Sequence, residues 1–201
     1  MEKLILLNRS QKARLLRDQL GFTLIELLVT ISILAILLAI AVPNFITFIQ
    51  NNRVTSQTND LVTALNYARS EAIKRGVRTT VCSRATDTSC AASTTWDTGW
   101  LVFVDCNGDG VRDLGTCPDW DAIGGADDEP VLLVRQPLQN GNTLRTGGIQ
   151  RVTYQSSGFS GFMGTLRLCD VRGTANARAT VVSFQGRVRT NTLVGEGLTC
   201  P

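Results

Sequence analysis

The pattern of apolar and polar residues divides the chain into three stretches. Sixteen residues from Leu27 to Val42 are all apolar except Thr30 and Ser32. Further on, apolar positions recur at intervals of three, four or seven, as they do on one face of a helix. This stripe consists of Val54, Leu61, Leu65, Ala68 and Ala72. Beyond Gly76 the chain consists of short β-type runs separated by glycine, proline and aspartate.

The first two stretches together predict one helix of about fifty residues, from Phe22 to Arg75. Its part from Phe22 to Val42 would be about 32 Å long at about 1.5 Å per residue, which is enough to cross the hydrocarbon core of a membrane. Pro43 can kink the helix where the apolar run ends. Gly76 is a natural end, because the basic residues Lys74 and Arg75 before it suit the negative end of the helix dipole.

Six runs rich in β-branched, aromatic and leucine residues predict strands. They are Val77 to Ser83, Trp100 to Asp105, Val131 to Gln136, Arg151 to Gln155, Thr165 to Asp170 and Arg178 to Gln185. The 125 residues from Val77 to Pro201 can bury one modest core. We therefore expect an α+β fold, in which an antiparallel sheet lies on the second half of the long helix.

The segment before the apolar run is basic. Met1 to Leu20 contains five lysine or arginine residues and two acidic ones, and positive charge of this kind keeps a segment on the cytoplasmic side of a membrane. A cleaved secretory signal is the alternative, because Ala39-Ile40-Ala41 offers a small-x-small cleavage pattern. Against it, the basic segment is long, and the apolar run exceeds the usual length of about 7 to 15 residues.

The junction between these two segments reads Gly21-Phe22-Thr23-Leu24-Ile25-Glu26. It resembles the class III signal of type IV prepilins and type II secretion pseudopilins. That resemblance implies that prepilin peptidase cuts between Gly21 and Phe22 on the cytoplasmic face and methylates the new Phe22 amine. It also implies that Glu26 pairs with the N-terminal amine of a neighbouring subunit during assembly. A carboxylate costs about 2.5 to 3.5 kcal/mol at the centre of a membrane helix, so Glu26 needs a function, unless its side chain reaches the nearby headgroups.

Two later stretches carry a second resemblance. Leu61 to Gly76 is similar to the helix end of the GspH/FimT group of minor pilins and pseudopilins, and Trp96 to Asp105 is similar to the next block of that group. The resemblance implies a prepilin leader at 1–21, a transmembrane and filament-core helix at 22–43, the amphipathic half of this helix at 44–76, and a disulfide-tied β-rich periplasmic domain at 77–201.

A member of that group is a non-enzymatic subunit that helps to initiate or cap a type IV pilus or a type II secretion pseudopilus. Its implied partners are prepilin peptidase, the inner membrane, and other minor and major pilins or pseudopilins. As a type II secretion system protein H, it would act in protein secretion. The alternative is a membrane-anchored binding module outside any filament, such as a calcium-regulated adhesin, which requires Gly21 to stay uncut.

Six cysteines follow the predicted helix. An even number in a small exported domain indicates disulfides formed in an oxidising periplasm. Among the roughly 15 pairings that six cysteines allow, we favour two that close short loops and one that ties down the C-terminus: Cys82 with Cys90, Cys106 with Cys117, and Cys169 with Cys200.

The chain has no histidine, which excludes Ser-His-Asp and Cys-His catalysis. We therefore expect neither enzymatic activity nor a zinc site.

The stretch Asp105-Cys106-Asn107-Gly108-Asp109-Gly110 fits the first half of a calcium loop. The predicted ligands are Asp105, Asn107, Asp109 and Asp113. The pattern then departs from a calcium loop, because its twelfth position is Thr116 where a bidentate glutamate is expected. A tight acidic turn without a metal is the alternative.

Charge is divided unevenly along the chain. Cys82 to Pro130 contains ten acidic and two basic residues, whereas Val131 to Pro201 contains eight arginines and two acidic residues. Within this basic part, Gly186-Arg187-Val188-Arg189 places two arginines at strand spacing after a glycine turn. The planar guanidinium group is suited to gripping phosphate.

The same four residues resemble the DNA-contacting motif of FimT-type minor pilins, which help to capture DNA in natural transformation. That resemblance implies that Gly186, Arg187 and Arg189 bind double-stranded DNA. The alternatives are a solvated edge strand, or an arginine patch that faces the acidic part of a neighbouring subunit.

Overall fold

The structure is a computed structural model that describes residues 21–118, 127–192 and 198–200 of the 201-residue chain. The chain forms two compact units, Met1–Phe45 and Ile46–Pro201. Of the predicted leader, only Gly21 lies within the described residues.

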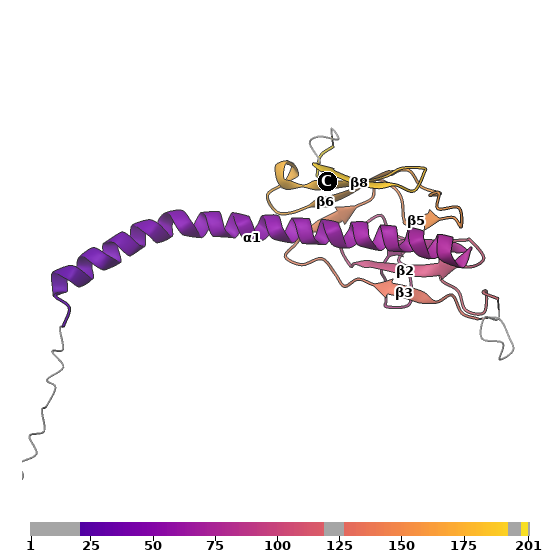
Figure 1. Cartoon of the computed structure of the whole chain (residues 1–201), viewed down its shortest axis with the longest axis horizontal. Helices are drawn as coiled ribbons and strands as arrows, with labels where there is room; N and C mark the ends of the chain where they lie inside the picture. The colour runs from indigo at the N-terminus through magenta and orange to yellow at the C-terminus, as the bar shows by residue number, and fades with distance from the viewer. Residues whose placement is uncertain (1–20, 119–126, 193–197, 201) are drawn as a thin grey trace, which may run out of the picture. The chain divides into compact units, whose positions relative to one another are not determined.

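Helix α1 comprises Leu24–Arg75 (Figure 1), so it begins two residues later than predicted. Thr23 caps its start, because the Thr23 hydroxyl oxygen accepts a hydrogen bond of 3.2 Å from the backbone N–H of Glu26. At the other end Gly76 has a φ of 70°, and its N–H donates to the Ala72 carbonyl at 3.1 Å. The helix therefore ends at a left-handed glycine, as predicted.

Within the described residues, eight strands form two antiparallel sheets. The first sheet has the order β3-β2-β1-β5 and consists of β1 (Arg78–Ser83), β2 (Trp100–Asp105), β3 (Val131–Val134) and β5 (Arg151–Tyr154). The second has the order β4-β6-β7-β8 and consists of β4 (Thr143–Arg145), β6 (Gly164–Cys169), β7 (Arg178–Val182) and β8 (Val188–Thr192). The 3-10 helix η1 (Thr174–Asn176) connects β6 to β7.

The predicted α+β class is confirmed, with the difference that the strands form two sheets instead of one. Alternation of apolar and polar residues shows which face of a strand is buried, but it does not identify the neighbouring strand. The predicted runs also omit β4, which has three residues between glycine-rich turns, and β8, whose sequence is mostly polar.

One core joins the second half of α1 to both sheets. The predicted stripe is confirmed, since none of its five residues is more than 2% exposed. It packs in one cluster with Val81 and Val102 of the first sheet and with Leu166 and Val182 of the second. In Figure 1, β2 and β3 lie on one side of this part of α1, and β6 and β8 lie on the other.

Three disulfides tie the loops of this unit. They are Cys82–Cys90, Cys106–Cys117 and Cys169–Cys200, with Cα–Cα distances of 5.7, 5.2 and 6.0 Å. These are the pairs favoured from the sequence. The last one holds the C-terminal segment against the second sheet, where Leu198 and Cys200 cover Ala177 and Ala179.

Candidate functional site

The residues of the predicted processing signal lie at the start of α1. Gly21 and Phe22 are exposed and lie outside any helix or strand, so the bond between them is accessible. Glu26 lies in the first turn of the helix, where a carboxylate interacts favourably with the helix dipole. Its side chain is exposed.

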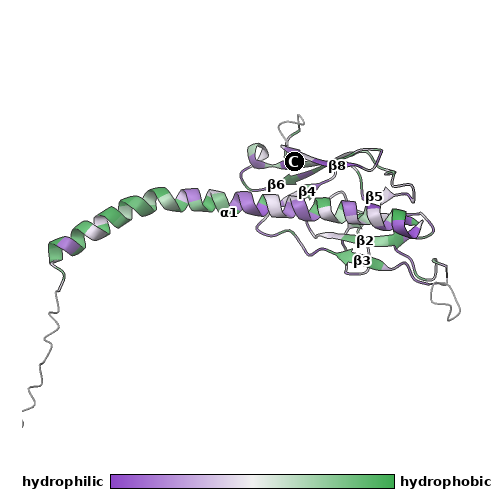
Figure 2. Cartoon of the chain, viewed as in Figure 1, coloured by the Kyte–Doolittle hydropathy of each residue, from purple (hydrophilic) through white to green (hydrophobic). Residues whose placement is uncertain are grey.

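The first half of α1 is apolar on all sides. Its large apolar side chains have exposed fractions from 40% at Ile49 to 81% at Leu24, and Figure 2 shows this part of the helix as mostly hydrophobic. Thr30 and Ser32 donate their hydroxyl hydrogens to carbonyls of the preceding turn at 2.8 and 2.7 Å, so both hydroxyl groups are satisfied within the helix. Among the described helices, α1 has the length and composition to cross a membrane. Such a surface requires cover by lipid or by other apolar helices.

The predicted arginine motif lies at the edge of the second sheet. Gly186 and Arg187 belong to the turn between β7 and β8, whereas Arg189 lies in β8, the edge strand. The Ser183 N–H donates to the Arg187 carbonyl at 2.9 Å, and the Gly186 N–H donates to the Ser183 carbonyl at 2.8 Å. Both arginines are exposed.

Gly186 positions this turn against the rest of the unit. Its φ is 75°, and a Cβ atom on it would lie 2.1 Å from the Gly158 carbonyl oxygen and 2.9 Å from Nε of Arg69. Arg69, on α1, donates from Nε to the Gly158 carbonyl at 2.9 Å and from Nη2 to the Gln185 carbonyl at 3.0 Å. The glycine of the motif therefore has a structural role, since it allows the close approach of two turns and a helix.

A third arginine, Arg167, lies on the face that the C-terminal segment partly covers; it is half-buried, and its Nη1 donates to the Thr199 carbonyl at 3.3 Å. Arg189 lies opposite Val181, and Arg167 of β6 lies opposite Ala179. Ala179 and Val181 are alternate residues of β7, so they share a face of the sheet. Their partners Arg167 and Arg189 therefore lie on that same face. Within the described ranges no acidic side chain forms an ion pair with Arg167, Arg187 or Arg189. We call these three residues the arginine surface.

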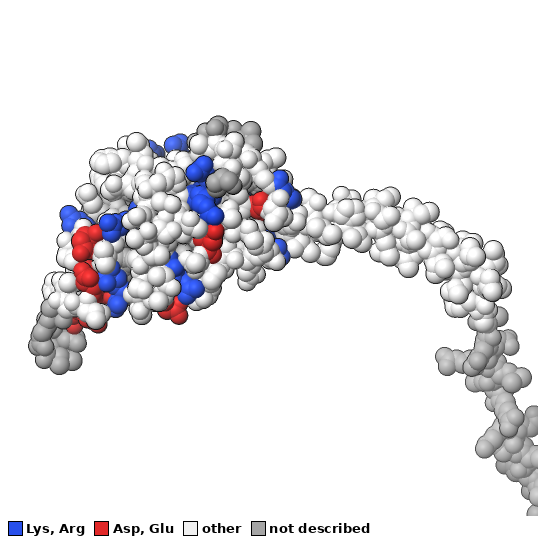
Figure 3. Space-filling view, turned by 180° about the vertical axis from the view of Figure 1, so that it is seen from behind, with Lys and Arg blue, Asp and Glu red and all other residues white. Residues whose placement is uncertain are grey.

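Three other arginines of the C-terminal part are neutralised by acidic partners. Arg135 pairs with Asp60, Arg145 with Asp97, and Arg172 with Asp170. Figure 3 shows basic and acidic side chains side by side on one face of the domain. Only some of the arginines in the C-terminal part are thus available to bind an external anion.

The predicted calcium ligands lie in one loop and are engaged by the chain. Asp105 is fully buried and accepts hydrogen bonds from the Thr80 hydroxyl at 2.8 Å and from the Gly108 N–H at 2.7 Å. The Asn107 amide nitrogen donates to Asp109 at 3.2 Å and to Asp113 at 3.1 Å. Hydrogen bonds thus join Asn107, Asp109 and Asp113 to one another, whereas Asp105 is bound to Thr80 and Gly108 instead.

Glu129 supports the same loop from beneath. It is fully buried, and its carboxylate accepts from the N–H groups of Cys106 at 2.8 Å and Asp113 at 2.9 Å. Its carboxylate also lies close to the sulfurs of Cys106 and Cys117. Those sulfurs are joined in a disulfide, so they are not free thiolates that could bind a metal.

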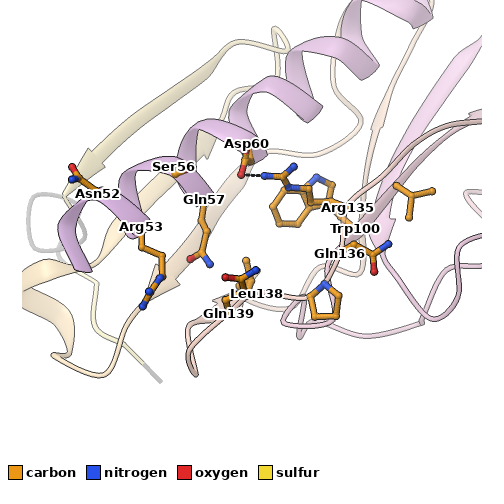
Figure 4. A pocket seen from close by; sticks show the side chains of 12 residues that line it. Asn52, Arg53, Ser56, Gln57, Asp60, Trp100, Arg135, Gln136, Leu138 and Gln139 are labelled. Atoms are coloured by element: carbon orange, nitrogen blue, oxygen red, sulfur yellow. Dashed lines mark hydrogen bonds and ion pairs between the residues drawn. The ribbon is translucent and has the colours of Figure 1, made fainter. Parts of the chain in front are cut away.

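A cleft of about 590 Å³ lies between α1 and the segment that follows β3 (Figure 4). Arg53, Gln57 and Asp60 line it from α1, and Arg135 faces Asp60 across it. Trp100 forms part of its wall and is 1% exposed. The lining contains three charged side chains, and two of them, Asp60 and Arg135, pair with each other.

Comparison with known proteins identifies the family. Residues 57–186 match the family described as Type II transport protein GspH. The chain belongs to this GspH family. Residues 16–42 match the prokaryotic N-terminal methylation motif. The chain is thus a member of the minor pilins and pseudopilins, which are structural subunits, and its apolar N-terminal helix is of the membrane-anchoring kind.

Two solved structures are similar to this GspH-family chain. Both are crystal structures of the type IV minor pilin FimU of Pseudomonas aeruginosa strain PAO1, and both are 18% identical to it. They cover 68% and 72% of this chain and 91% and 92% of the FimU chains, with TM-scores of 0.47 and 0.49. No curated protein sequence matches the chain.

Three residues with roles in these sites were not found from the sequence. The alternation of Arg167 with the buried residues Leu166 and Leu168 is a signal that could have placed this arginine on the outer face of β6. Arg69 and Glu129 carried no such signal, because their partners are backbone groups 89 and 23 residues away in the sequence.

Proposed function

We propose that this chain is a minor pilin or pseudopilin that prepilin peptidase cuts between Gly21 and Phe22, and that then helps to initiate or cap a filament in the bacterial envelope. The observation that supports this proposal is the exposed apolar half of α1, most of which lies within the matched methylation motif. Each large apolar side chain gains about 1.5 to 3 kcal/mol when it is fully buried. Lipid covers these side chains before assembly, and the helices of neighbouring subunits cover them afterwards.

In this proposal Glu26 selects the register of assembly. Cleavage creates a positive amine at Phe22, and the apolar surroundings strengthen its attraction to the Glu26 carboxylate of a neighbouring subunit. The cap by Thr23 begins the helix at Leu24, so Phe22 remains outside it. The amine is therefore free to reach a second helix. The disulfide-tied unit lies in the periplasm, where disulfides form.

The proposal is tested in cells that carry single substitutions. Gly21→Phe should block cleavage, and mass spectrometry should then find no methylated Phe22. Glu26→Ala should leave cleavage and membrane insertion intact but lower the amount of the subunit in sheared filaments, whereas the matched change Thr30→Ala should not. Equal incorporation of the Glu26→Ala and native proteins would overturn the pairing role.

A second candidate function is DNA capture by the arginine surface. It is favoured by Arg187 and Arg189, which are exposed at a sheet edge and form no ion pair with an acidic residue of the described ranges, with Arg167 on the same face as Arg189. The logarithm of the binding constant for duplex DNA falls linearly with the logarithm of the salt concentration. The slope is about 0.9 for each phosphate contact. Double-stranded DNA should therefore bind the full-length protein in detergent with a steep salt dependence.

The double substitution Arg187→Ala, Arg189→Ala tests this second candidate. It should remove most of the affinity and lower the salt slope by about 2. Arg53→Ala combined with Lys74→Ala removes the same charge elsewhere and should retain the affinity. If both double variants bind DNA equally, the arginine surface is not the site. A subunit of a type II secretion pseudopilus would instead show a secretion defect on deletion and no loss of DNA uptake.

A further inference from the structure

We propose that Phe159 and Phe184 form a stacking site for unpaired bases, so that the arginine surface binds single-stranded DNA in preference to a duplex. We call these two residues the aromatic pair. The inference rests on the proposed DNA capture and names its substrate more narrowly.

The aromatic pair is exposed although its rings are in contact. Phe159 is 42% exposed and Phe184 is 55% exposed. Their ring centroids are 5.7 Å apart with an interplanar angle of 61°. In this edge-to-face arrangement the edge of one ring meets the face of the other, so each ring keeps a face that its partner does not cover.

Backbone hydrogen bonds fix the two turns that carry the rings. The Ser160 N–H donates to the Phe184 carbonyl at 2.9 Å, and the Gln155 N–H donates to the Phe159 carbonyl at 2.8 Å. Arg69 binds a carbonyl in each of the two turns. The site is therefore formed before a ligand arrives, and little conformational entropy is lost on binding.

The charge around the aromatic pair suits a polyanion. Phe184 and Arg187 belong to the same turn, which is closed by the hydrogen bond between Ser183 and Arg187. Arg189 follows about 7 Å further along the chain at about 3.4 Å per residue. The segments 155–161 and 183–192 contain no acidic residue.

The combination of aromatic rings and arginines favours unpaired over paired bases. Arginines contact the phosphates of a duplex and of a single strand alike. An aromatic ring can stack only on a base whose face is free, and such stacking is sequence-tolerant. An apolar docking site for a protein would not depend on aromatic character, because leucine fills a similar volume.

Fluorescence anisotropy with labelled oligonucleotides tests the inference, using the full-length protein in detergent. A (dT) oligonucleotide should bind at least about fivefold more tightly than a duplex of the same length. Phe159→Leu with Phe184→Leu should abolish that preference and leave duplex binding unchanged. Phe184→Tyr should retain the preference, and so should Met163→Leu, which changes an exposed apolar residue outside the pair.

The outcomes separate the two proposals. If duplex and single strand bind equally, or if the double leucine variant keeps the preference, the stacking site is overturned while DNA capture stands. If neither DNA form binds, both proposals fail. If the double leucine variant binds DNA normally but no longer enters filaments, the aromatic pair is a subunit contact and the inference is overturned. Thermal unfolding of each variant shows whether a loss of binding reflects a loss of folding.

Discussion

Arg69 of helix α1 donates a hydrogen bond of 2.9 Å from Nε to the carbonyl oxygen of Gly158, 89 residues further along the chain. The same guanidinium also binds the carbonyl of Gln185. One side chain on the helix thus joins a turn after β5 of the first sheet to the turn between β7 and β8 of the second.

Replacement of Arg69 by alanine should loosen both turns. Hydrogen bonds to a charged group contribute about 1.5 to 3 kcal/mol each, and the partial exposure of Arg69 places the loss at the lower end of that range. We expect a lower midpoint of urea unfolding for Arg69→Ala. Asn66→Ala, on the exposed side of the same helix, serves as the control and should unfold with the native protein. A native-like midpoint for Arg69→Ala would show that the turns hold together without it.

Gly186→Ala should be more destabilising than an ordinary glycine replacement. The new Cβ would lie 2.1 Å from the Gly158 carbonyl oxygen, in addition to the strain of a φ of 75°. Gly173→Ala is a matched control, because Gly173 has a φ of 82° and no atom within 4 Å of the added Cβ. Thermal unfolding should show the larger decrease for Gly186→Ala by more than about 1 kcal/mol. Equal decreases would mean that the turn can shift away from Gly158.

Glu129→Ala should unfold the acidic loop locally. It leaves two N–H groups, those of Cys106 and Asp113, without their acceptor. An unsatisfied buried group costs about 1 to 3 kcal/mol, so the free energy of unfolding should fall by about 2 to 5 kcal/mol. The neighbouring exposed residue Asp128 provides the comparison, since Asp128→Ala should cost less than about 1 kcal/mol. Hydrogen exchange at Cys106 and Asp113 should become fast in the first variant and stay slow in the second.

Stability should depend on pH through Glu71. The hydrogen bond from Arg75, at 2.7 Å, holds the pKa of this buried carboxyl below its ordinary value of 4.5, with a smaller contribution from the charge of Lys74. Because the folded pKa is below the unfolded one, the stabilisation is complete above the unfolded pKa and is lost as pH falls through the folded pKa. Glu71→Gln should therefore be less stable than the native protein at pH 7, and the difference should shrink on acidification. A difference that stayed constant with pH would assign the effect to packing.

Calcium at Asp105, Asn107, Asp109 and Asp113 stays a prediction from the sequence. The hydrogen bonds within the loop lead us to expect no change in melting temperature when calcium is removed with EGTA. A decrease that calcium reverses, and that Asp109→Asn with Asp113→Asn abolishes, would establish the site. Asp87→Asn changes an exposed aspartate outside the loop and provides the control.

The sequence predicted the features that depend on local spacing. The apolar run, the stripe on α1 and the glycine at Gly76 each follow from a period or a cap, and the structure contains all three. The division into two sheets could not be predicted in this way, because it depends on which strands pair. The two contacts of Arg69 could not be predicted either, because both of its partners are backbone carbonyl groups, which every residue possesses.

In the candidate site, too, the sequence showed only those residues that are neighbours along the chain. The motif from Gly186 to Arg189 was visible as four consecutive residues, and its two arginines are exposed at a sheet edge. Phe159 and Phe184 are 25 positions apart and carry no shared motif. Only the contact between two turns makes them one surface.

The last turn of α1 gives the chain a property that is useful for mapping its neighbours. The chain contains three lysines, Lys3, Lys12 and Lys74, and the side chain of Lys74 is 74% exposed. If the leader is removed as proposed, only Lys74 and the Phe22 terminus carry an amine. An amine-specific cross-linker would therefore report contacts from two known points, one at each end of the helix.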